Sequence, residues 1–115
     1  MISSYSDLIQ ASYSQQEPQR LLFVFCRAEL PDEASPEEKA AFERGEGGAL
    51  TPVVCVDKTP DEAPDFATLH EESRATGQSW DVVFVAAMSG RGGTPPSTDE
   101  AQQPLTMMVE SIRLG

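Results

Sequence analysis

The chain has 115 residues and a mass of 12.5 kDa, the size of one domain. Its 39% hydrophobic and 23% charged residues are an ordinary globular balance, which excludes a disordered chain or a membrane-spanning one. The 19 acidic and 8 basic residues give a net charge of −11, which repels the polyanionic surfaces of nucleic acids and membranes. We therefore expect residues 1–115 to form a single domain that binds neither of them.

The N-terminal segment predicts a helix and a cytoplasmic protein. It has no basic residue before Arg20 and no apolar core of signal-peptide length, so export by that route is not expected. Ser4 and Asp7 form an N-cap pattern ahead of a weak apolar stripe, and Pro18 ends the segment.

Three short apolar runs rich in valine and phenylalanine predict three strands: Leu21–Ala28, Val53–Val56 and Trp80–Met88. Their near-continuous apolar character is typical of strands that are covered on both faces. Pro52 lacks a backbone donor and places the second run at a sheet edge. Cys26 and Cys55 lie inside two of the runs, where we expect buried free thiols rather than a disulfide.

Helix signals lie between and after these runs. Ser35 and Pro36 begin a short helix with a capping box to Glu38, and Gly45 ends it. A turn is expected over 59–63 and a helix over 64–76, since Pro64 would break a helix that began earlier. The last helix is expected to begin near Pro104, after a turn over 97–103 with its own cap. Its apolar face has helical spacing: Leu105, Met108, Val109 and Ile112.

Alternating helices and strands predict an α/β domain with a small three-stranded, mainly parallel sheet and about four helices. The two most apolar strands belong together and the proline-bearing strand belongs at an edge, so the predicted spatial order is second, first, third. A two-layer arrangement, or a homodimer that extends the sheet, is an alternative because three strands are few.

Parallel strands place a candidate ligand site at their carboxyl ends, between the first and third strands. Arg27 and Glu29 follow the first strand, and a glycine-rich loop follows the third: Ser89, Gly90, Arg91, Gly92 and Gly93. Glycine backbone N–H groups beside a guanidinium are suited to bind a small anion or a phosphate ester. The alternative is an ordinary flexible connection, for which glycine is equally suited.

Other motifs give no catalytic set. Asp57, Lys58 and Thr59 resemble the phosphorylated segment of P-type ATPases, but Pro60 stands where that family has glycine and the chain is too short for its nucleotide domain. His70 is the only histidine and stands on a predicted helix among acidic residues. Because no spacing of histidines and cysteines fits a zinc site, we expect no catalytic residue, metal or cofactor.

Several segments resemble a family of small uncharacterised proteobacterial proteins: Leu21–Phe25, Gly45–Pro52, Val56–Pro60, Ser89–Gly93 and Met108–Ile112. Some members carry the label ribonucleotide reductase alpha subunit. The residues do not support that label, because the reductase needs a large barrel and a redox-active cysteine pair. The resemblance implies a bacterial cytoplasmic protein and supplies no catalytic residue.

The function expected from these observations is a small acidic, non-enzymatic domain that binds another protein. The acidic excess in the middle of the chain suits a basic partner. The alternative is a protein that binds a small anion or a nucleotide-like phosphate ester through Arg27 and the loop 89–93.

Overall fold

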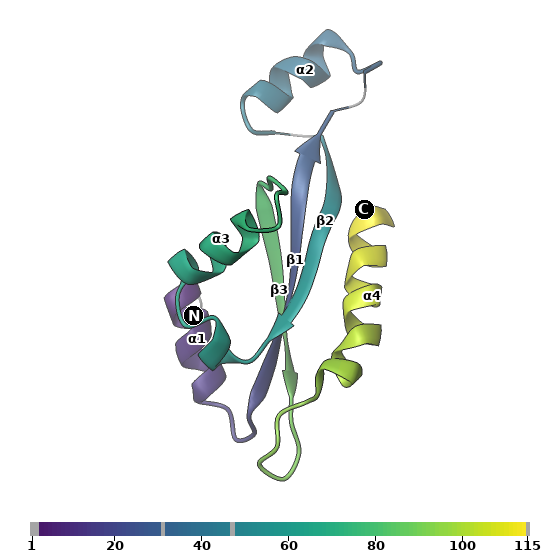
Figure 1. Cartoon of the computed structure of the whole chain (residues 1–115). Helices are drawn as coiled ribbons and strands as arrows, with labels where there is room; N and C mark the ends of the chain where they lie inside the picture. The colour runs from purple at the N-terminus through teal and green to yellow at the C-terminus, as the bar shows by residue number, and fades with distance from the viewer. Residues whose placement is uncertain (1–2, 31, 47, 115) are drawn as a thin grey trace.

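A computed structural model describes residues 3–30, 32–46 and 48–114, and helices and strands alternate along it as predicted (Figure 1). The elements in chain order are α1 (Tyr5–Tyr13), β1 (Gln19–Glu29), α2 (Pro36–Glu43), β2 (Ala49–Lys58), the 3₁₀ turn η1 (Pro60–Glu62), α3 (Phe66–Arg74), β3 (Val82–Ser89) and α4 (Thr98–Leu114).

The three strands form one sheet in the order β2-β1-β3, which confirms the predicted order. The prediction of a mainly parallel sheet is wrong, because β1 pairs antiparallel with both β2 and β3. The reason lies in the connection between β1 and β2. Its helix, α2, has no buried residue and does not pack as a crossover on the sheet, so the chain simply reverses. The strands β2 and β3 run in the same direction, but β1 lies between them.

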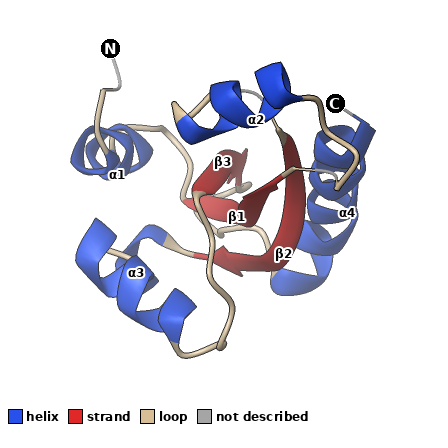
Figure 2. Cartoon of the chain, turned by 90° about the horizontal axis from the view of Figure 1, so that it is seen from above, coloured by secondary structure: helices blue, strands red, loops and turns tan. Residues whose placement is uncertain are grey.

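Helices cover both faces of the sheet, as the view from above shows: α1 and α3 on one side, α4 on the other (Figure 2). On the first side Leu21, Phe23 and Phe25 of β1 pack with Ile9 and Leu69. On the second side the alternate residues of β1 pack with α4, and the buried members of that cluster are Leu22, Val24, Cys26, Ala101 and Leu105. Burial on both faces explains the unbroken apolar run of β1.

The sequence signals place most helix ends closely. Ser35 and Glu38 form the expected capping box of α2, with Pro36 in its first turn. The helix α3 begins at Phe66 behind the N-cap Asp65, within the predicted range. The helix α4 begins at Thr98 rather than near Pro104, so residues 98–103 of the expected turn are already helical.

The molecule is elongated, because β1 and β2 extend beyond β3 and carry α2 at their tip (Figure 1). Its radius of gyration is 16.1 Å, against about 13 Å for a compact domain of this length. No helix of the described residues is long and apolar enough to span a bilayer.

Both cysteines are free, as expected, but only one is buried. Burial raises the pKa of the Cys26 thiol on the central strand. The expectation of a buried thiol is wrong for Cys55, because it lies on the edge strand β2, where its side chain is exposed.

Candidate functional site

The predicted anion site is not assembled, because antiparallel strands carry its two halves to opposite ends of the sheet. Gln19 pairs with Ser89 and Cys26 pairs with Val82. Cys26 lies seven positions beyond Gln19 along β1, which corresponds to about 23 Å at about 3.3 Å per residue. Arg27 therefore lies at one end of the sheet, and Arg91 lies at the other.

Arg27 and Glu29 have local partners at their own end. The Arg27 guanidinium donates to the backbone oxygen of Ser79 at 3.3 Å and to the side chain of Gln78 at 3.2 Å. Its remaining nitrogen lies 3.7 Å from a Glu29 carboxylate oxygen, and the Thr51 hydroxyl donates to the other oxygen. These contacts fasten the ends of the strands to neighbouring loops.

The glycine-rich loop forms a tight turn. Arg91 and Thr94 exchange both backbone hydrogen bonds at 3.0 Å, and Gly92 and Gly93 between them have φ values of 58° and 82°. Two consecutive residues at positive φ are what a two-residue hairpin turn of type I′ requires. The Gly93 N–H donates to the Glu17 carboxylate at 2.8 Å, so an acid of the chain itself occupies that donor.

Ser89 and Gly90, the remaining residues of the predicted site, are also engaged within the chain. The Ser89 hydroxyl accepts from the Gln19 side chain at 2.9 Å. The Gly90 N–H donates to the backbone oxygen of Pro18 at 2.8 Å. A side chain at Gly90 would collide with the Thr94 oxygen, since a Cβ built there lies 2.0 Å from it. The glycines of this segment are thus explained by the turn.

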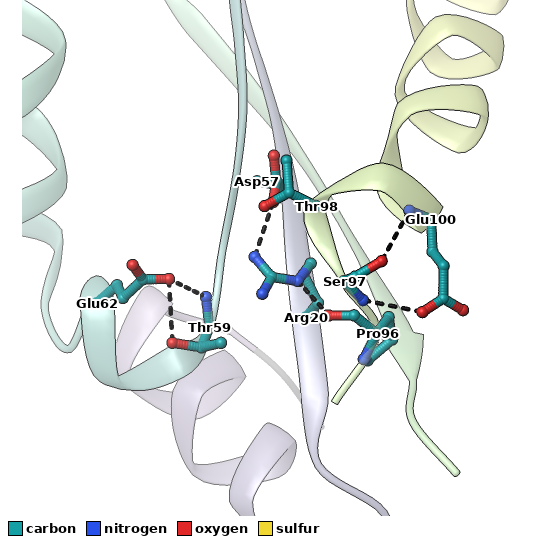
Figure 3. A network of polar contacts seen from close by, with 8 residues as sticks. All are labelled: Arg20, Asp57, Thr59, Glu62, Pro96, Ser97, Thr98 and Glu100. Atoms are coloured by element: carbon teal, nitrogen blue, oxygen red, sulfur yellow. Dashed lines mark hydrogen bonds and ion pairs between the residues drawn. The ribbon is translucent and has the colours of Figure 1, made fainter. Parts of the chain in front are cut away.

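The Asp57 carboxylate is held in a polar network rather than left free as a phosphoryl acceptor (Figure 3). It accepts from the Arg20 guanidinium at 2.7 Å and from the Thr98 hydroxyl at 3.0 Å.

His70 packs beside Trp80, with 5.7 Å between the ring centroids, while the Trp80 indole donates to the Ser73 hydroxyl. The described residues contain no group of three or more potential metal ligands.

The described surface has an apolar groove along α4, bordered by Phe84 of β3 and by the start of β2, which we call the α4 groove. Its volume is about 750 Å³, within the range of ligand-binding clefts. Its lining, as far as the structure describes it, contains no ionisable side chain and consists of Gly48, Leu50, Phe84, Pro104, Met107, Met108, Ser111 and Ile112. Such a lining offers apolar contact and no acid, base or nucleophile other than one serine hydroxyl, so the groove is suited to binding.

The groove exists because one helix cannot cover three strands. The helix α4 packs mainly over β2 and β1, so the same face of β3 is left partly uncovered. Phe84 of β3 is 36% exposed there, and Met107 on the facing side of α4 is 62% exposed. Two large apolar side chains therefore remain accessible to solvent on one surface.

The α4 groove was not predicted, although the sequence of the last helix contains signals for it. Met107 and Met108 are typical of a core stripe or of an interface, and Pro104, Met107 and Ser111 form a second stripe at helical spacing beside the predicted core stripe. A helix with two neighbouring non-charged stripes has more apolar surface than a three-stranded sheet can bury.

No protein-family model, no curated protein and no solved structure matches this chain. The resemblance to the proteobacterial family therefore stays a prediction.

Proposed function

We propose that this chain is a non-enzymatic protein-interaction domain that holds an apolar segment of a partner protein in the α4 groove. The observation that supports the proposal is that Phe84 and Met107, two large and exposed apolar side chains, line the same hollow. Burial of apolar side chains stabilises the fold because it removes them from water. Exposed apolar side chains contribute no such stabilisation until a partner covers them.

The lining favours a partner segment that is apolar on one side and carries basic residues at its rim. Methionines are flexible and polarisable, so the neighbouring Met107 and Met108 adapt to more than one apolar shape. The net charge of −11 attracts basic residues that flank the apolar segment of the partner. Salt shortens the range of this attraction. An amphipathic helix in a groove is a recurring solution of this kind.

Matched substitutions on two faces of the molecule test the proposal. Met107→Gln removes apolar surface from the groove, while Tyr13→Gln removes it from α1 on the opposite side of the sheet. The two side chains are similarly exposed, at 62% and 58%. A partner captured by the wild type is expected to bind Met107→Gln about tenfold more weakly and Tyr13→Gln unchanged. Equal binding by both variants would place the interaction surface elsewhere.

The alternative proposal, binding of a small anion through the loop 89–93, has less support from the geometry. It would require Gly93 to exchange the Glu17 carboxylate for the ligand. Stabilisation of the wild type by inorganic phosphate that is absent in Arg91→Ala would favour this alternative over the groove.

A further inference from the structure

The outer edge of β3 carries unpaired backbone groups. Within the described residues β3 pairs only with β1. The Gly90 N–H donates to Pro18, and directions alternate along an antiparallel ladder, so the N–H and C=O groups of Val83, Val85 and Ala87 are directed away from β1. Such a row is a template on which another strand pairs.

The other edge of the sheet has the features by which proteins prevent such pairing. The strand β2 contains Pro52, is irregular opposite Phe25 and Cys26, and ends in the charged pair Asp57 and Lys58. The strand β3 has none of these features. Between Asp81 and Arg91 it contains no proline and no ionisable residue. Only one of the two edges is therefore open to a partner strand.

The side chains of β3 also lack full cover. Val82 is 38% exposed on the side of α4, next to Phe84. On the other side Val83 and Val85 are only half-buried, and Ala87 is exposed. A long apolar strand with an open edge and two partly covered faces gains burial and hydrogen bonds together when another strand pairs with it.

We propose that two copies of this chain pair β3 with β3 in antiparallel fashion about a twofold axis, which forms one six-stranded sheet. The strand suits a copy of itself, because its charge-free stretch lets two chains of charge −11 meet without opposing like charges. The antiparallel arrangement also brings the Asp81 end of each strand to the Arg91 end of the other, so neither end of the junction brings two like charges together.

The pairing of the two β3 strands also enlarges the α4 groove. The functional meaning of this enlargement rests on the proposed function, whereas the pairing of the strands does not. Each groove is lined by Phe84 on the side of β3. In the dimer the two grooves meet above the paired β3 strands, and the α4 helices of the two copies form the outer walls. The interaction surface of one copy is thereby completed by the other.

Proline substitutions on the two edge strands test the pairing. Ala87→Pro removes an outward-directed N–H from β3 at an exposed side chain, which an edge strand tolerates. Cys55→Pro is the matched control on β2. Cys55 is exposed and lies opposite Val24, whose backbone faces β3, so its N–H also points outward.

Sedimentation equilibrium of the full chain is expected to give twice the monomer mass of 12.5 kDa for the wild type and for Cys55→Pro, and the monomer mass for Ala87→Pro. Raised salt is expected to strengthen the dimer, because it screens the repulsion between two acidic copies. A monomeric wild type, a dimeric Ala87→Pro variant or a monomeric Cys55→Pro variant would each overturn the pairing.

Hydrogen exchange of the wild type provides a measurement that needs no variant. In the dimer the amides of Val83, Val85 and Ala87 are expected to exchange as slowly as those of Phe84 and Ala86 between them. Fast exchange confined to the three outward amides would contradict the proposal.

The two proposals are tested separately, because Ala87 lies on the face opposite the groove. The effect of Ala87→Pro on the mass of the particle tests the pairing, and the effect of Met107→Gln on partner binding tests the groove.

Discussion

The Arg20 guanidinium lies 2.7 Å from the Asp57 carboxylate, and each side chain is 14% exposed. Arg20 also donates to the backbone oxygen of Pro96, and the Thr98 hydroxyl donates to the same carboxylate (Figure 3). One ion pair thus joins β1, β2 and the start of α4. These contacts hold the first residues of α4 against the sheet. They thereby position α4, which forms one wall of the α4 groove.

Removing one member of this pair is expected to destabilise the fold strongly. Asp57→Ala leaves the Arg20 guanidinium partly buried without a counter-charge, which costs about 2–4 kcal/mol of unfolding free energy. Glu46→Ala breaks an exposed pair with Arg44 and is expected to cost less than about 1 kcal/mol. Urea unfolding measures both. Equal losses would show that the Arg20 pair is not a structural anchor.

The cap of α4 makes stability depend on acid pH. Hydrogen bonds from the Ser97 backbone and hydroxyl hold the pKa of the Glu100 carboxyl below its ordinary value of 4.5. A lowered pKa in the folded state means that the carboxylate stabilises the fold above pH 4.5 and that this stabilisation is lost as pH falls through the lowered pKa. The stability difference between wild type and Glu100→Gln is therefore expected to shrink on acidification. A difference that stays constant across this range would contradict it.

Tyr5 makes stability depend on alkaline pH in the opposite direction. Burial, followed by the nearby carboxylates of Asp65 and Glu72, raises its pKa from 10.0 to about 12. The neutral phenol donates to the backbone oxygen of Ala63 at 2.6 Å. This contribution is complete below pH 10 and is lost as pH rises towards about 12. Tyr5→Phe is expected to cost about 1 kcal/mol at neutral pH and to lose stability less steeply above pH 10.

Residues of α4 are expected to differ in how much they contribute to the unfolding free energy, since some are buried in the core and others line the groove. Leu105 is buried against β1, so Leu105→Ala should lower the unfolding free energy by about 2–4 kcal/mol. Met107 lies in the groove and is largely exposed, so Met107→Ala should change it by less than about 0.5 kcal/mol. Thermal unfolding of the two variants checks this contrast. A large loss for Met107→Ala would identify it as a core residue.

Local signals in the sequence predicted the elements well because they act over a few residues. The capping box of Ser35 and Glu38 begins α2 where expected, and the apolar run from Leu21 becomes the buried central strand. Pro52 correctly placed β2 at an edge. Pro104 was misleading, because a capping box between Ser97 and Glu100 begins the helix earlier and the proline is accommodated inside it.

Strand direction was not predictable in the same way, since it depends on whether the intervening helix packs on the sheet. The sequence of α2 gives a helix, but its face has nothing to bury. The predicted pairing of Arg27 with Arg91 depended on parallel strands and is absent for that reason. The α4 groove was missed because it arises from a mismatch between one helix and three strands, which no single segment encodes.

Site-specific photo-crosslinking shows whether a partner protein binds in the α4 groove. A photoreactive phenylalanine analogue replaces Met107 in the groove or, as the control, Tyr13 on α1. The probe at position 107 is expected to capture a defined partner protein, and Ser111→Trp, which fills the groove, is expected to abolish the capture. Identical products from positions 107 and 13, or capture that survives Ser111→Trp, would contradict it.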